Sequence, residues 1–229
     1  MQHIVKKINA VVRDHFEKRK IEALPKTCGL LVNYKTLKIT KYCLTSFRKF
    51  YPRVPLIVID NSDYDQSSDW LYQFAKKDTN TMLLFNTYNM HHGPSMHNGI
   101  ILAHNLFENV LIFDSDILFL KSNIIEDMLT AIGDKKFICC GIMGWVDNNG
   151  LNVKKNEGIP YVHPRCILIN INEYLKLPPF QKHGAPCLDT MKFIYDNKLT
   201  NLLIEFDIDP YVKHLYKGTV NETGGYHLK

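Results

Sequence analysis

The hydrophobic and polar positions of this chain alternate between short apolar runs and segments with helical spacing. The first half contains four apolar runs of strand length, at 28–33, 55–60, 81–86 and 110–114. Between them lie three segments whose apolar residues recur every three or four positions, at 36–50, 67–76 and 95–107. This alternation predicts a parallel sheet with helices on both faces. The runs are apolar throughout, as expected of strands that are buried on both sides.

The second half continues the pattern with longer connections. Residues 122–132 predict a helix capped by Ser122, and 137–142 and 166–170 predict strands. Residues 184–190 open another helix, and residues 146–160, rich in Asn, Gly and Lys, have the composition of an exposed loop. Apolar residues at helical spacing in 1–22 predict a peripheral helix. We therefore expect one α/β domain spanning residues 1–229.

Composition and charge narrow the class of protein. The 229 residues are 45% hydrophobic and 11% aromatic, which is ample for a core, and no run approaches the length of a membrane span. The net charge of +5 is mild and scattered, so we expect no nucleic-acid partner. The six cysteines form no CxxC pair and no Cys/His zinc spacing. With no secretory signal visible, they indicate free thiols in the cytoplasm.

Polar residues follow every strand of the first half. Asn33-Tyr34, Asp60-Asn61-Ser62, residues 86–93 and Asp114-Ser115-Asp116 stand at the ends of the four runs. Ligands of parallel α/β sheets bind beyond the carboxyl ends of the strands, so these residues predict one shared pocket. Gly93, Pro94 and Ser95 lead into the next helix, and a helix N-terminus is a ready site for a phosphate.

Asp114 and Asp116 carry the strongest chemical signal. Side chains two residues apart on an extended segment point the same way, so both carboxylates face one spot. Two close like charges are costly unless a positive group neutralises them, and a divalent cation with room for a phosphate is the usual solution. A polar turn after a core strand is the structural alternative. His91, His92 and His97 fit no standard zinc spacing, so the acidic pair is the better site for a hard cation.

Taken in order, these segments resemble a nucleotide-sugar-dependent glycosyltransferase of the GT-A fold, most similar to glycosyltransferase family 2. The matching segments are 31–34, 44–47, 58–62, 93–99 and 112–116. The resemblance implies a mostly parallel central sheet with helices on both faces. It also implies a nucleotide-sugar-binding half near residues 28–120 and an acceptor-binding half near 121–229.

The resemblance assigns roles to single positions. Asp60 would hold the base or ribose of the donor, with Asn33 and Tyr34 lining the base pocket. Four residues would flank the ribose and diphosphate: Gly93, Pro94, Ser95 and Asn98. Asp114-Ser115-Asp116 would be the DxD element, which contacts the ribose and a Mn²⁺ or Mg²⁺ that bridges the diphosphate. One position departs from the family, which often carries an Arg where this chain has His97.

The second half supplies the remaining candidates. Inverting members of the resembled family use a carboxylate base from a helix start in the acceptor half, and Asp189 occupies such a position. An acidic residue there also interacts favourably with the helix dipole, so position alone does not separate the two roles. Asp147 and Glu157 are weaker alternatives for the base. His214 is expected to complete the metal site, with His227 as second choice, and Lys217 to contact the diphosphate.

The resulting hypothesis is a metal-dependent hexosyltransferase that moves a sugar from a nucleotide donor to a hydroxyl acceptor with inversion. A UDP-sugar is favoured as donor and a GDP-sugar is possible, while the acceptor is a glycan, lipid or protein. Three alternatives remain: a retaining GT-A enzyme, a sugar-phosphate nucleotidyltransferase and a binding protein without catalysis. Asn33-Tyr34-Lys35 replaces the Gly-rich segment expected of nucleotidyltransferases, and the intact acidic pair argues against a purely binding role.

Overall fold

A computed structural model describes residues 26–181 and 184–215. The peripheral helix expected over residues 1–22 lies outside this part of the chain. Among the described residues, no helix is both long and apolar enough to cross a membrane. All six cysteines are described, and each is a buried free thiol, as their spacing predicted.

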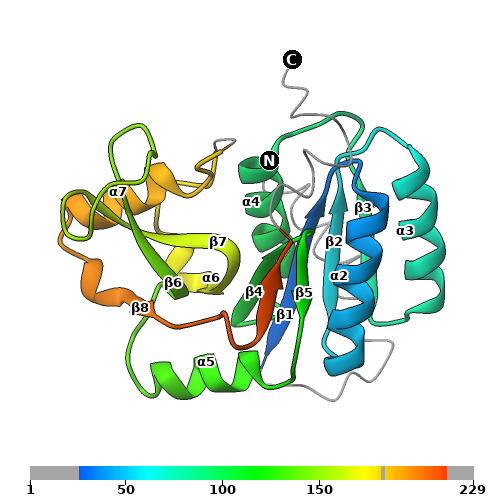
Figure 1. The fold of residues 1–229 in the computed structure, drawn as a ribbon, viewed down its shortest axis with the longest axis horizontal. Helices are drawn as coiled ribbons and strands as arrows, with labels where there is room; N and C mark the ends of the chain where they lie inside the picture. Colours follow the sequence, from blue (N-terminus) through cyan, green and yellow to red (C-terminus); the bar gives the residue numbers. More distant parts are fainter. Residues whose placement is uncertain (1–25, 182–183, 216–229) are drawn as a thin grey trace.

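A central sheet organises the molecule. Its strands are β1 (Thr27–Asn33), β2 (Leu56–Asp60), β3 (Thr81–Phe85), β4 (Asn109–Asp114), β6 (Cys139–Val146), β7 (Ile159–Asn170) and β8 (Leu203–Glu205). Their order across the sheet is β3-β2-β1-β4-β7-β6-β8 (Figure 1). The first four strands are parallel, β7 runs antiparallel to both β4 and β6, and β8 is parallel to β6. The prediction of a mostly parallel α/β sheet is therefore confirmed, with the reversal at β7.

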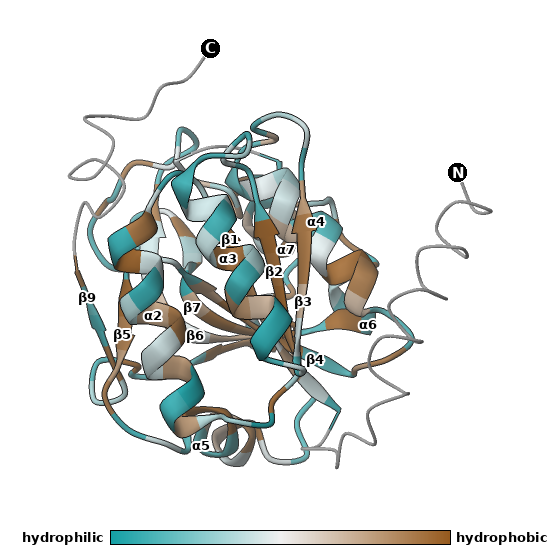
Figure 2. Ribbon diagram, turned by 90° about the vertical axis from the view of Figure 1, so that its right-hand side faces the viewer, coloured by the Kyte–Doolittle hydropathy of each residue, from teal (hydrophilic) through white to brown (hydrophobic). Residues whose placement is uncertain are grey.

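Helices cover both faces of this sheet. They are α2 (Leu37–Phe50), α3 (Gln66–Lys77), α4 (His92–Ala103), α5 (Ile124–Ile132), α6 (Ile171–Tyr174) and α7 (Leu188–Asp196), with a short 3₁₀ turn at Thr200–Leu202. Apolar residues of α2, α3 and α5 pack on one face, and those of α4 and α7 pack on the other. In Figure 2 the strands are largely brown, whereas α2 and α3 turn much teal surface outward.

Close packing brings α4 onto β1. A Cβ on Gly99 would lie only 2.5 Å from Leu30 Cδ1, so a larger residue there would force the helix away from the sheet. Met96 and Ile100 on the same helix are fully buried. The start of α4 is thereby held against the carboxyl ends of the strands.

The structure corrects several predicted boundaries. Helix α4 begins at His92 rather than at Ser95, and β7 begins at Ile159 because its first residues pair with β6. The cap predicted at Ser122 is wrong: α5 is preceded by Asn123, which adopts the left-handed conformation (φ 73°) that Asn tolerates better than most residues. A hydrophobic pattern does not reveal such local turns.

A second, two-stranded sheet brings the end of the described chain to the middle of the molecule. Strand β5 (Ile117–Phe119) pairs antiparallel with β9 (Val212–His214), and Ile117 is opposite His214. The backbone N–H of Leu215 donates to the carbonyl of Asp116 at 2.8 Å. This pairing fixes a histidine from the far end of the described chain beside the acidic segment.

Candidate active site

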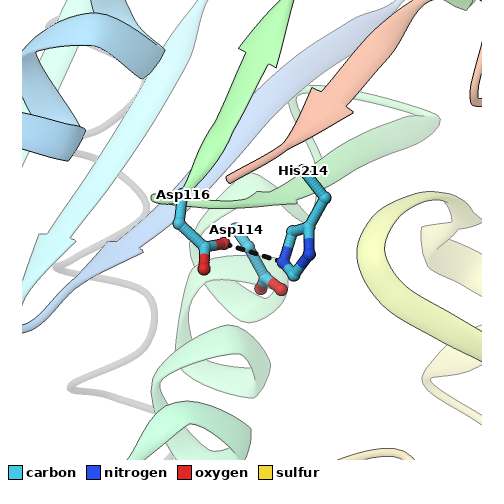
Figure 3. A group of neighbouring side chains, drawn as sticks. All are labelled: Asp114, Asp116 and His214. Atoms are coloured by element: carbon cyan, nitrogen blue, oxygen red, sulfur yellow. Dashed lines mark ion pairs between the residues drawn. The ribbon is translucent and has the colours of Figure 1, made fainter. Parts of the chain in front are cut away.

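Asp114, Asp116 and His214 converge at one point. Asp114 ends β4, Asp116 precedes β5, and His214 ends β9. One ligand atom from each side chain lies within 4.8 Å of the other two, and Figure 3 shows the three groups pointing toward one another. Asp116 Oδ1 and His214 Nε2 are 3.1 Å apart. The topology thus joins residues that lie far apart in the sequence.

One carboxylate oxygen of Asp114 remains available to accept a hydrogen bond or to bind a cation. Its Oδ1 is buried and accepts no hydrogen bond from any described residue, although His92 Nε2 lies 3.5 Å away. The pKa of His214 is raised, chiefly by its hydrogen bond to Asp116. A buried carboxylate oxygen without a donor is costly, so the cluster favours a positive ligand.

The residues present fit a divalent metal ion. Two carboxylates and one imidazole provide oxygen and nitrogen ligands of the kind that Mn²⁺ accepts. The expected DxD pair and the expected histidine therefore lie where such an ion would need them. Lys217 and His227, the other two candidates from the C-terminal segment, lie outside the described residues.

Asp60 lies at the centre of a buried network instead of lining an open pocket. It is only 1% exposed. Oδ1 accepts hydrogen bonds from Asn33 Nδ2 at 2.8 Å and Ser62 Oγ at 2.5 Å, while Oδ2 accepts from Ser68 Oγ. Because both oxygens are engaged within the protein, this carboxylate organises the loop after β2.

The same network reaches the acidic segment through β1. Asn33 is fully buried, and its Oδ1 accepts from the hydroxyls of Thr36 and Thr40 at 3.0 and 2.8 Å. Thr36 Oγ1 in turn lies 3.3 Å from the hydroxyl of Ser115. Asn33 and Ser115 are thus linked through the buried hydroxyl of Thr36. Tyr34 is only partly buried, with Lys35 Nζ 5.6 Å from its ring centre.

Asn61 organises the neighbouring strand ends, a role that its place among the polar residues after the second strand did not reveal. Its Oδ1 accepts from Asn86 Nδ2 at 2.6 Å and from Ser95 Oγ at 3.0 Å. Its Nδ2 donates to the carbonyl of His91 at 3.3 Å. These contacts join β2, β3 and the start of α4. The signal available in the sequence was its place directly after Asp60 at a strand end.

The other residues predicted around the donor lie in the first turns of α4. Gly93 and Ser95 are buried, Pro94 is partly exposed and Asn98 is exposed. Asn98 Nδ2 lies 3.9 Å from Met90 Sδ. His97, the position that departs from the family, faces the second half, where its Nδ1 is 2.9 Å from the Tyr174 hydroxyl. Burial lowers the pKa of His97.

Asp189 occupies the first turn of α7, as predicted. The charge of Asp114 contributes to raising the pKa of Cys187, the residue at the N-cap of α7, although burial is the larger cause. The start of α7 therefore lies within electrostatic range of the acidic pair. A loop also packs on this start: a Cβ on Gly150 (φ +83°) would lie 2.6 Å from Ala185 Cβ.

The alternative carboxylates are less suited to accept a proton. Asp147 Oδ1 accepts from the backbone N–H groups of Asn149 and Leu151 at 2.8 and 2.9 Å. These bonds, with the one from Leu151 largest, lower the pKa of Asp147. Glu157 is exposed in the loop after β6. A carboxylate with a lowered pKa is a weaker base than an ordinary one.

Comparison with known proteins identifies the family and the fold. The profile of glycosyl transferase family 2 matches residues 30–199. GalNAc-T7 with UDP, GalNAc and Mn²⁺ superposes with a TM-score of 0.65 at 15% identity, covering 86% of this chain and 45% of that one. The mannosyltransferase PcManGT from Pyrobaculum calidifontis, in complex with GDP-Man and Mn²⁺, superposes with a TM-score of 0.61 at 12% identity. The match covers 89% of this chain and 66% of that one.

A third solved structure is S. aureus TarS 1–349 with UDP-GlcNAc, with a TM-score of 0.58 at 19% identity, covering 84% of this chain and 61% of that one. No curated protein sequence matches significantly. This chain thus spans between 45% and 66% of the length of these three structures. At such identities the structural likeness establishes the fold, and the profile match establishes the family. The chain belongs to glycosyl transferase family 2, and it has the GT-A fold.

Proposed function

We propose that this protein transfers a hexose from a nucleotide-diphosphate sugar to an acceptor hydroxyl with inversion, using a divalent cation. The observation that carries the proposal is the convergence of Asp114, Asp116 and His214 within 4.8 Å. The similar structures contain Mn²⁺ with GDP-Man or with UDP, which supports Mn²⁺ as the ion and a UDP- or GDP-sugar as the donor. Mg²⁺ would satisfy the same carboxylates.

The donor would bind across the carboxyl ends of β1, β2 and β4. Tyr34 is partly exposed at the end of β1 and would line the base pocket. Asp60 and Asn61 would shape that pocket through the loops they hold, because their side chains are buried and hydrogen-bonded. The N-terminus of α4, beginning at His92, would face the ribose and diphosphate with the backbone N–H groups of its first turn.

The cation site would act on the leaving group. When the sugar departs, negative charge develops on the phosphate oxygens, and a bound divalent cation stabilises that charge. Asp114 and Asp116 would hold the ion beside the diphosphate, and His214 would contribute a neutral nitrogen ligand. Because His214 has a raised pKa, protons compete with metal for its Nε2.

Asp189 would serve as the base that accepts the proton of the acceptor hydroxyl. An inverting transfer needs one carboxylate on the acceptor side of the reacting carbon. The start of α7 lies on the same face of the sheet as α4 and in electrostatic range of Asp114, which supports this position. Asp147, whose oxygen is already engaged by two N–H groups, is a poorer base.

A donor panel tests the function. Purified protein is incubated with individual UDP- and GDP-sugars and Mn²⁺, and release of the nucleoside diphosphate is measured with and without a chelator. We expect metal-dependent turnover of one donor class and its loss in Asp116→Asn. The anomeric configuration of the product, read by NMR, separates inversion from retention. Turnover that survives both chelation and Asp116→Asn would contradict the proposed mechanism.

A further inference from the structure

The pairing of β4 with β7 brings a cationic residue level with the acidic pair. The antiparallel register runs from Asn109 opposite Asn170 to Phe113 opposite Cys166. Continued by one residue, it places Asp114 beside Arg165. Ile112 lies two residues before Asp114, and Ile167 lies two residues after Arg165. Both isoleucines belong to the core on the face of the sheet that α4 and α7 cover. Because side chains alternate along a strand, Asp114 and Arg165 extend toward that same face.

The guanidinium of Arg165 is largely enclosed and only partly satisfied. Its side chain is 14% exposed, and Nη2 lies 3.1 Å from Asp209 Oδ1. Nε is buried and donates to no described residue. An Arg carries five N–H donors in a rigid fork, so most of its capacity remains for another acceptor. A buried donor of this kind favours an anionic ligand.

The pKa of a neighbouring thiol is influenced both by Arg165 and by Asp114 of the acidic pair. Asp114 contributes to raising the pKa of Cys166, for which burial is the larger cause, and Arg165 opposes that shift. The guanidinium and the carboxylate of Asp114 thus act on the same thiol. Unlike a histidine, Arg stays charged at every physiological pH, and its fork matches phosphate oxygens.

We propose that Arg165 binds the diphosphate of the nucleotide-sugar donor, as a second positive group beside the cation held by Asp114, Asp116 and His214. This inference rests on the function proposed above. Asp209 is then the residue that orients the guanidinium, and the remaining N–H donors of Arg165 meet the phosphate oxygens. The role is one of binding and leaving-group stabilisation, since the side chain gives up no proton.

Calorimetric titration tests the role of Arg165 separately from turnover. The ligands are UDP, GDP, uridine and guanosine, each with Mn²⁺, and UDP and GDP also without metal. The proteins are wild type, Arg165→Gln, Arg165→Lys and Asp209→Asn. We expect Arg165→Gln to weaken binding of the nucleoside diphosphate about tenfold or more while nucleoside affinity stays unchanged, since hydrogen bonds to charged groups are lost. The diphosphate affinity of Arg165→Lys should fall between those of wild type and Arg165→Gln. Asp209→Asn should keep most of the wild-type affinity.

The outcomes are distinct. Unchanged diphosphate affinity in Arg165→Gln overturns this inference and leaves the proposed function standing. Equal losses of diphosphate affinity in Arg165→Gln and Asp209→Asn, with equal drops in unfolding temperature, would mean that Arg165 only stabilises the fold. That result also overturns the inference. Failure of the wild type to bind UDP or GDP overturns both proposals. Equal unfolding temperatures for Arg165→Gln and wild type, together with selective loss of diphosphate binding, support it.

Discussion

His97 Nδ1 lies 2.9 Å from the hydroxyl of Tyr174, and this contact links the two halves of the chain. His97 belongs to α4, in the first half, and Tyr174 ends α6, in the second. The same hydroxyl accepts the backbone N–H of Phe180 at 3.0 Å. The imidazole and the hydroxyl share one hydrogen bond, in which either group can be the donor, and burial lowers the pKa of His97. The position that departs from the family therefore joins α4 to α6.

Removing this hydroxyl should destabilise the protein. In Tyr174→Phe, the N–H of Phe180 and Nδ1 of His97 lose their common partner in a site where Tyr174 is 1% exposed. Unsatisfied buried groups cost about 1–3 kcal/mol, so the free energy of unfolding in urea should fall by that amount. Tyr195→Phe, at a tyrosine that is 49% exposed, is the matched control and should change little. Equal stability of both variants would show that this contact does not stabilise the fold.

The lowered pKa of His97 predicts a pH dependence of stability. Its folded pKa lies below the ordinary 6.5, so the unfolded chain binds the proton more tightly. Stability from this residue is therefore complete above about pH 6.5 and is lost as pH falls from there through the folded pKa. The free energy of unfolding, measured from about pH 8 to about pH 5, should drop more for wild type than for His97→Gln. Parallel curves would contradict this assignment.

Asp60→Asn should weaken both the fold and the donor pocket. The amide cannot accept from Ser62, Ser68 and Asn33 as the carboxylate does. We expect a loss of roughly 1–3 kcal/mol in the free energy of unfolding. The affinity for the donor nucleotide, measured by calorimetry, should fall with it, because the loop after β2 loses its anchor.

A second acidic residue in the loop after β2 provides the control for Asp60. Asp63 is exposed and has a positive φ of 57°, a conformation that Asn also tolerates. Asp63→Asn therefore removes a charge from the same loop without backbone strain, and it should leave stability and nucleotide affinity close to wild type. An equal loss in both variants would contradict the role given to Asp60.

Much of the fold followed from the sequence because its signals were local. Apolar runs such as 110–114 and the helical spacing of 36–50 reflect burial directly, and β4 and α2 lie there. The acidic pair was visible for the same reason. The link between Asp116 and His214 depends on the pairing of β5 with β9, and the sequence alone left His214 and His227 unseparated.

Two site features were beyond sequence reasoning. The burial of Asp60 depends on hydroxyls from Ser62 and Ser68 closing around it, and a strand-end aspartate looks the same whether it is open or enclosed. The placement of Arg165 depends on the antiparallel register of β7 against β4. Register is set by contacts between distant segments, so no local pattern in the sequence predicts it.

Asp189→Asn should slow transfer without weakening donor binding. If Asp189 is the base, its amide variant cannot accept the proton of the acceptor hydroxyl, and kcat should fall about 10²–10⁴-fold. The affinity for the nucleoside diphosphate with Mn²⁺ should stay at the wild-type value. Glu157→Gln, at an exposed carboxylate in the loop after β6, is the control. Near-normal kcat in Asp189→Asn, with a large loss in Asp147→Asn, would move the base to Asp147.

Electron paramagnetic resonance of Mn²⁺ measures whether Asp114, Asp116 and His214 hold a divalent cation. Free Mn²⁺ gives a strong signal that weakens on binding, so a titration counts bound ions with no need for a known acceptor. The exposed Asp134 supplies a control variant away from the cluster. We predict one site per chain that tightens when UDP or GDP is added, and its loss in Asp116→Asn and His214→Ala but not in Asp134→Asn. Undiminished Mn²⁺ binding in Asp116→Asn and His214→Ala would contradict the account.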